Sequence, residues 1–564
     1  MRFTKHLAAA SIGVMTACAA SPPALAAAGD PGAALGLAPG AAAAMRSIDA
    51  ERIRAHVRFL SDDLLEGRGP GTRGGELAAK YIATSFALDG LKPAGDDGGY
   101  LQKVEFGGVQ TQAGTSFSLH PEHGAVLDLK LGDDFVTNNQ TQTASVDIDA
   151  PIVFVGYGIE APEYHWNDYQ GVDVKGKVVL LFVNEPPSKD PKFFGGEALT
   201  YYGRWTYKFE QAARKGAVGV LIIHRTDLAS YGWPVVRNSW SAEQVYLAGD
   251  RDPKVESAAW IQLEAARKLF EASGLKLDDM LAAAGTRGFK ARALPVRLEA
   301  HIVSKVRKFR SYNVVGLLPA EHGSDTQAVI YSAHYDHLGI DPALSGHQIY
   351  NGAVDNATGV GMLLELAHAF ATSAARPAHP VVFASVTAEE KGLLGSNYLG
   401  KHLPIPAKRI ALDLNFDAVP PIGVPESVSV TGAERTTFYP TVEKTAKAFG
   451  FEIQPDPEPG AGHYYRSDHF SLARAGVPAF SIDSGSKFAG HPPEWGKAQA
   501  EDYTAKRYHS PADVYSPSMD FRSDAILAQF GFALGWQALT ASGTVNWLPG
   551  DEFEAVRLRG DQAK

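Results

Sequence analysis

The residues of this 564-residue chain whose types and spacing could do chemistry are two histidines and four carboxylates. They are His334, Asp355, Glu389, Glu390, Asp417 and His509. Imidazole nitrogens and carboxylate oxygens suit a pair of divalent cations such as zinc. Five of the six would fill such a site, and Glu389 would stay off the metals as the general base of a hydrolase. The set predicts hydrolysis of a peptide or related amide.

Short apolar segments place these side chains at the ends of predicted strands. Residues 328–334, 381–387 and 409–417 are rich in apolar residues, which is typical of buried strands. Residues 359–371 have an apolar face at helical spacing, so Asp355 would lie in the loop before a helix. Strand, helix and strand predict a mostly parallel sheet covered on both faces by helices. Ligands of such sheets gather beyond the carboxyl ends of the strands, so these side chains should meet in one site.

The motifs around these residues resemble those of the M28 family of co-catalytic zinc peptidases, which are mostly aminopeptidases. The similar segments are HYDHLG, NGAVDNATG, TAEEKGLLGS, NFD and YHSPAD. The resemblance covers residues 47–135 and 296–540. It implies the zinc exopeptidase fold, a mostly parallel mixed α/β sheet between layers of helices. It also implies two zinc ions per chain and peptides as substrates.

The resemblance implies a role for each metal-binding residue. His334 and Asp417 would bind one zinc, and Glu390 and His509 would bind the other. Asp355 would bridge the two ions, which a shared carboxylate holds about 3.5–4 Å apart in sites of this kind.

Four further roles follow from the same resemblance. Glu389 would take a proton from the attacking water and pass it to the leaving amine. Asp336 would fix the ring of His334, and Tyr508 would donate to the oxyanion. The peptide bond before Asn356 would be cis.

Other polar residues near the motifs have simpler interpretations. Asp513 is interpreted as a turn or cap residue, and the histidines without a motif as structural or surface residues. Those histidines are His337, His463, His469 and His491. Arg466 and Arg507 could hold a substrate carboxylate, so a carboxypeptidase or dipeptidase is an alternative on the same site. A receptor-like protein that kept the fold and lost catalysis is a second alternative, and the intact set of six argues against it.

Composition limits the class of protein. The chain is 45% hydrophobic, and its length predicts two to three domains. A net charge of −10 and a pI of about 6.0 disfavour nucleic acid as a partner. Beyond the N-terminal segment, no stretch of sequence is long and apolar enough to predict a transmembrane helix.

The N-terminus predicts export, to the periplasm or the medium. Arg2 and Lys5 precede an apolar stretch over 7–20, and cleavage after Ala26 would make residues 1–26 a signal peptide. A competing interpretation is a lipobox that ends at Cys18, the single cysteine, which would then carry a lipid anchor. Residues 27–46 are rich in Ala, Gly and Pro and predict a flexible leader.

The remaining sequence divides into a catalytic domain and an insertion. Residues 47–135 and 296–545 would form the catalytic domain, and residues 546–564 a polar tail that frays. The insertion, residues 136–295, is expected to be β-rich and resembles the protease-associated domain. It would cap the active site or shape access to it. Residues 484–508 are expected to form a long loop that lines the substrate pocket.

Overall fold

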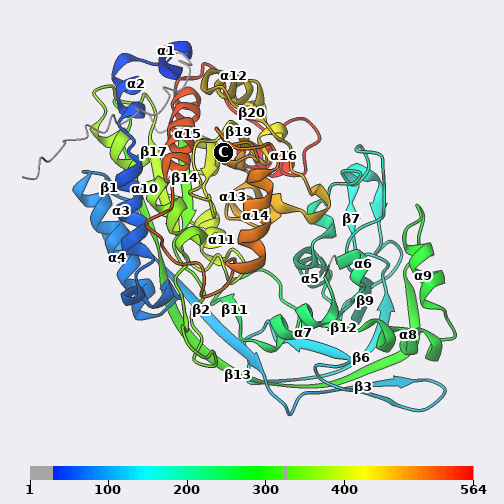
Figure 1. Cartoon of the computed structure of the whole chain (residues 1–564). Helices are drawn as coiled ribbons and strands as arrows, with labels where there is room; N and C mark the ends of the chain where they lie inside the picture. Colours follow the sequence, from blue (N-terminus) through cyan, green and yellow to red (C-terminus); the bar gives the residue numbers. More distant parts are fainter. Residues whose placement is uncertain (1–29, 230, 323–326, 563–564) are drawn as a thin grey trace, which may run out of the picture.

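The structure, a computed structural model, describes residues 30–229, 231–322 and 327–562. The part that was predicted to be the catalytic domain is a mixed sheet with a parallel centre (Figure 1). The parallel strands, in spatial order, are β21 (Ala479–Ser481), β18 (Ile410–Asn415), β14 (Ala328–His334) and β17 (Val381–Val386). β13 (Arg292–Leu318), β2 (Leu101–Thr111) and β11 (Gln244–Leu247) extend it with antiparallel pairs. The predicted fold class and the three predicted strands are confirmed.

Helices cover both faces of this sheet because successive side chains of a buried strand point to opposite sides. Val329 and Tyr331 of β14 pack into one apolar cluster, whereas Ala328 and Ile330 pack into another. The helices of the first cluster are α3 (Ala50–Leu60), α4 (Arg73–Leu88), α10 (Gly359–Thr372), α12 (Tyr439–Phe449) and α15 (Arg522–Thr540). Those of the second are α11 (Leu394–Lys401) and α13 (His469–Arg474).

Both segments that were expected to be flexible contain packed helices. Residues 30–46 form α1 (Pro31–Ala34) and α2 (Pro39–Arg46), and Met45 is buried in the first cluster. Near the other end, Trp547 and Phe553 are buried in the second cluster before α16 (Glu554–Gln562). The flexible leader (27–46) and the frayed tail (546–564) were therefore wrong for the described residues. In each segment, a few large apolar side chains pack into the core, although most residues of the segment are small or polar.

Two other sequence predictions concern the loop 484–508 and the N-terminal residues 1–26. The expected loop 484–508 contains the helix α14 (Trp495–Lys506), which buries only Gly496 and so has no apolar face to predict it. Residues 1–26, with the predicted signal peptide and Cys18, lie outside the described residues. Among the described helices, none is long and apolar enough to cross a membrane.

The inserted module has its own sheet. The strands β6 (Ser145–Phe154), β9 (Val178–Phe182), β10 (Gly219–Ile223) and β12 (Ser257–Ile261) run parallel, and β5 (Phe135–Asn138) closes one edge. Its helices are α5 (Trp205–Arg214), α6 (Thr226–Ala229), α7 (Trp233–Ser241), α8 (Leu263–Ala272) and α9 (Leu277–Ala284). The module is thus more helical than the β-rich insertion that the sequence predicts.

The module also begins earlier than the predicted boundary at residue 136. β3 (Ser116–Pro121) pairs with residues 296–301 of β13 and with β4 (Leu127–Leu129). Its residues Phe117 and Leu119 belong to the apolar cluster of the module. The chain enters the second sheet between β2 and β3 and returns within the continuous strand β13, which has no break to mark the boundary.

Candidate metal centre

The carboxyl ends of three adjacent parallel strands bring the candidate ligands together. His334 is the last residue of β14, Glu390 follows β17, and Asp417 follows β18. Asp355 comes from the turn Ala353–Thr358, which leads into α10. His509 follows α14. The site lies where the open α/β sheet predicts it, beyond the carboxyl ends of its strands.

Asp355 lies between two pairs of ligand-type side chains. Its Oδ1 is 3.4 Å from Nε2 of His334, and that nitrogen is 3.0 Å from Oδ1 of Asp417. Its Oδ2 is 3.3 Å from Nε2 of His509, and that nitrogen is 3.0 Å from Oε2 of Glu390. Ligand atoms about 2.0–2.1 Å from a tetrahedral zinc lie roughly 3.3 Å from one another. The donor set and its spacing therefore fit two cations that share Asp355.

His337 is a ligand-type residue in the site that the sequence analysis interpreted as structural. Its Nδ1 is 2.6 Å from Oε1 of Glu390, and His337, Asp355 and Glu390 form a group that could hold a metal ion. Its Nε2 is buried without a hydrogen-bond partner among the described residues. Two histidines, His337 and His509, thus compete for the position beside Glu390. The sequence signal was its place three residues after His334.

The backbone on both sides of Asp355 is anchored. Asp513, interpreted as a turn or cap residue, instead accepts hydrogen bonds from the N–H groups of Val354 and Asp355 at 3.0–3.1 Å. The side chain of Asn356 accepts a hydrogen bond from the N–H of Ala418, one residue after the ligand Asp417. The peptide bond between Asp355 and Asn356 is cis, as the resemblance implied.

Arg68 is a buried cation beneath the same loop, and nothing in the sequence analysis singled it out. Its guanidinium donates to four main-chain carbonyls at 2.5–2.8 Å. They are those of Leu60, Tyr335, Asn351 and Gly352. Tyr335 follows the ligand His334, and Gly352 precedes Asp355, so one side chain joins two ligand-bearing segments. Burial lowers the pKa of Arg68 to about 10 against the raising effect of Asp355 and Asp513.

Asp336 contacts the site differently from the expectation. The Nδ1 of His334 donates to the main-chain carbonyl of Asp336 at 3.2 Å, while the carboxylate of Asp336 is 3.8 Å away. That carboxylate accepts a hydrogen bond from the N–H of Glu389 at 3.1 Å. The backbone of Asp336 therefore orients the ring of His334, and its side chain positions the start of the Glu389–Glu390 turn.

Glu389 and Tyr508 lie at the edge of the ligand cluster. The carboxylate of Glu389 is 3.9 Å from Nε2 of His334, and its side chain is 12% exposed. Burial raises the pKa of Glu389 well above its usual range, and Glu390 adds to this effect against the lowering effect of His334. Tyr508 is exposed and stacks on His509 with ring centroids 3.9 Å apart.

Comparison with known proteins shows what the segment around this site is similar to. Residues 313–528 match the model of peptidase family M28. The chain is 29% identical over 223 residues to leupeptin-inactivating enzyme 1 of Streptomyces exfoliatus. The aligned residues make up 38% of this chain and 47% of that protein. It is 29% identical over 238 residues to a probable leucine aminopeptidase of Trichophyton verrucosum. These aligned residues make up 40% of this chain and 54% of that protein. The chain spans about half the length of these curated relatives.

A solved aminopeptidase from Aneurinibacillus sp. strain AM-1 is also similar, with a TM-score of 0.47 and 19% identity. That likeness covers 88% of this chain and 95% of the other. The segment 313–528, which matches the model of peptidase family M28, contains all six candidate residues.

Proposed function

We propose that this protein is a two-zinc exopeptidase that removes N-terminal residues from short peptides. The observation that carries the proposal is Asp355, whose two oxygens face two separate histidine–carboxylate pairs. The M28 match and the names of the relatives, which include a probable leucine aminopeptidase, support peptides as substrates.

In this proposal each ligand has one position. His334 and Asp417 would hold one zinc ion, Glu390 and His509 would hold the other, and Asp355 would serve both. Bound there, the ions supply a Lewis acid that polarises the scissile carbonyl and lowers the pKa of a water molecule.

The protein's own side chains move the proton. Glu389 is close to the cluster yet outside both ligand groups, so it would accept a proton from the attacking water. The same carboxyl group would then give that proton to the leaving amine. Tyr508, beside His509, would donate a hydrogen bond to the oxyanion from the exposed side of the site.

We also propose that the inserted module is a protease-associated domain that shapes access to the site, and that residues 1–26 direct export. The position of the module beside α11 and α13 supports the first proposal. The apolar N-terminal stretch supports the second. Sequencing of the natively produced protein should find Ala27, or a lipidated Cys18, at its N-terminus. An intact Met1 would refute export.

One peptide in three forms tests the reaction. The zinc-loaded protein should cleave the free peptide and fail on the N-acetylated peptide, because a blocked amine cannot occupy a site that reads the N-terminus. Strong chelation should abolish cleavage of the free peptide, and zinc should restore it. If acetylation is harmless and C-terminal amidation abolishes cleavage, the carboxypeptidase alternative is correct. Full activity of a verified metal-free preparation would exclude the metal mechanism.

A further inference from the structure

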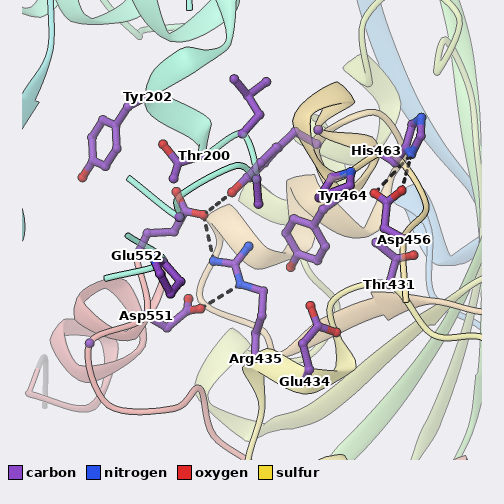
Figure 2. Close-up of a pocket in the computed structure, with 18 of the residues that line it drawn as sticks. Thr200, Tyr202, Thr431, Glu434, Arg435, Asp456, His463, Tyr464, Asp551 and Glu552 are labelled. Carbon is purple, nitrogen blue, oxygen red and sulfur yellow. Dashed lines mark hydrogen bonds and ion pairs between the residues drawn. The ribbon is translucent and has the colours of Figure 1, made fainter. Parts of the chain in front are cut away.

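Arginines at the junction of the two modules have acidic partners. Arg435 lines a cavity of about 360 Å³ between the modules and pairs with Asp551 at 2.8 Å and Glu552 at 2.7 Å (Figure 2). Arg474 of α13 pairs with Glu210 of α5 at 3.1 Å. Such pairing is the rule for guanidinium groups withdrawn from water, since a buried charge without a partner is costly.

Two other arginines of this junction have no acidic partner among the described residues, and Arg204 is partly buried whereas Arg466 is exposed. Arg204 immediately precedes α5 of the inserted module, and Arg466 precedes Ser467 of the catalytic domain. Among the described residues, neither side chain has a hydrogen bond or an ion pair, and the Nε of Arg204 is buried without a partner. Burial, followed by the positive charge of Arg466, lowers the pKa of Arg204 to about 10.

Ring contacts bring these two arginines together across the junction. Tyr201, whose carbonyl accepts a hydrogen bond from the N–H of Arg204, packs on Tyr465 with ring centroids 6.2 Å apart. Tyr465 directly precedes Arg466. The two like charges are therefore held on facing surfaces by the fold. An anion between them would relieve their repulsion and would give the buried Nε of Arg204 an acceptor.

The chain segment that carries Arg466 adjoins the metal centre. Ser467, the neighbour of Arg466, donates a hydrogen bond from Oγ to Oδ2 of the candidate ligand Asp417 at 2.6 Å. Consecutive Cα atoms are about 3.8 Å apart, and an extended dipeptide or tripeptide spans roughly 7–11 Å. A peptide whose N-terminal residue occupies the metal centre would extend its next residues toward the segment that carries Arg466.

We propose that Arg204 and Arg466 form a subsite for a carboxylate on the leaving-group side of the scissile bond. This proposal rests on the proposed function and adds a substrate class, short peptides with a carboxylate one or two residues beyond the cleaved bond. Guanidinium groups suit this ligand because their planar N–H donors match the two oxygens of a carboxylate. Arg507, which the sequence analysis grouped with Arg466, instead packs on the ring of Tyr503.

The test compares kcat/KM for Ala-Ala with that for Ala-Ala-amide, and for Ala-Glu-amide with that for Ala-Gln-amide. We expect the wild-type protein to prefer the carboxylate member of at least one pair by about 10- to 100-fold, which is roughly the effect of a charge-assisted contact. A preference in the first pair identifies the C-terminal carboxylate as the ligand, and one in the second identifies an acidic side chain. Arg204→Gln and Arg466→Gln should each bring the ratio toward one, and Arg204→Lys should keep part of it.

Arg267→Gln is the matched control, because Arg267 lies on α8 of the same module in an exposed ion pair with Glu264. It should keep the wild-type ratio. The subsite is refuted if the wild-type ratios are near one, or if the Arg204 and Arg466 variants keep them. If the wild-type protein cleaves none of the four peptides, the proposed function fails. Calorimetric titration of the zinc-loaded protein with Ala-Ala and Ala-Ala-amide then still decides, because equal Kd values for the two would refute the subsite.

Discussion

At the scale of single residues, the candidate centre is defined by which oxygen faces which histidine. Asp355 uses both of its oxygens, one toward His334 and one toward His509. Asp417 uses one oxygen toward His334 and is held through the other by Ser467. These contacts mark the residues that would bind metal. Glu389, the proposed base, lies outside them, so substitutions can tell the two roles apart.

Replacing Glu389 should remove the base and spare the metals. Glu389→Gln is expected to lower kcat by about 10²–10⁴-fold, because general base catalysis typically contributes that much. Zinc content, measured by elemental analysis, should stay at two per chain. Glu390→Gln is the matched control and should lose zinc. If Glu389→Gln loses the metal and Glu390→Gln keeps it, the two roles have been exchanged.

The position beside Glu390 can be assigned to one of its two histidines. His509 approaches both Asp355 and Glu390, whereas His337 makes its short contact with Glu390 alone. We therefore expect His509→Gln to lose one zinc ion. His337→Gln should keep two but bind the second about 10- to 100-fold more weakly, which is typical for loss of a residue that orients a ligand. Metal titration with a competing chelator measures the number of zinc ions bound and the affinity for the second one. If His337→Gln loses one zinc ion and His509→Gln keeps two, His337 is the ligand.

Some of these residues were visible in the sequence, and others were not. The six residues named from strand ends and motifs meet in the structure, because parallel strands align their carboxyl ends. Their metal-binding roles stay predictions. Asp513 and Arg68 act through neighbours far away in the chain, so no local pattern marked them. His337 was interpreted as structural although it lies three residues after the candidate ligand His334.

At the scale of elements, the site depends on turns between strands and helices. Gly352 has a φ of +56°, and a Cβ there would lie 2.1 Å from the carbonyl oxygen of Asp355 and 2.8 Å from a guanidinium nitrogen of Arg68. The sequence predicted β14, β17 and α10 well, because buried strands and an apolar helical face leave strong patterns. It failed for α14 and α2. The first buries only one glycine, and the second is a short alanine-rich segment that packs mainly through small side chains.

Arg68 should stabilise these turns and, through them, metal binding. Arg68→Met would leave four buried carbonyls without their donor, and each such loss costs about 1–3 kcal/mol. We expect the free energy of unfolding to fall by roughly 3–5 kcal/mol in total, because the backbone can partly relax. The zinc affinity should fall about 10- to 100-fold.

Denaturant unfolding and competitive metal titration check the two effects. Arg73→Met is the matched control, because Arg73 is 77% exposed and its nearest acidic oxygen is 3.5 Å away. It should change stability by less than about 1 kcal/mol. Wild-type stability and metal affinity in Arg68→Met would show that the four hydrogen bonds do not hold the site.

At the scale of the whole molecule, two sheets share one strand. β13 pairs with β17 and β2 in the catalytic domain and with β6 and β3 in the inserted module. Figure 1 shows this strand running along the base of both parts. The contact between the modules is completed above it by Arg474 with Glu210, and by Lys401 with Asp250 at 2.9 Å. The module is thus attached at two levels beside the candidate centre.

Breaking the upper contact should loosen the module without removing the shared strand. Arg474 pairs with Glu210 and covers the rings of Tyr201 and Phe470, with both charged groups about two thirds buried or more. Arg474→Gln removes the charge and leaves Glu210 only with Tyr201 and Arg214, which belong to its own module. Because the pair is intermediate between exposed and buried ion pairs, we expect a loss of about 1–3 kcal/mol in the free energy of unfolding. Calorimetry should also show a broader transition, since the two cores would unfold less cooperatively.

Arg267→Gln, on an exposed face of the same module, should behave like the wild-type protein. A sharp wild-type transition in Arg474→Gln would mean that the shared strand alone couples the modules.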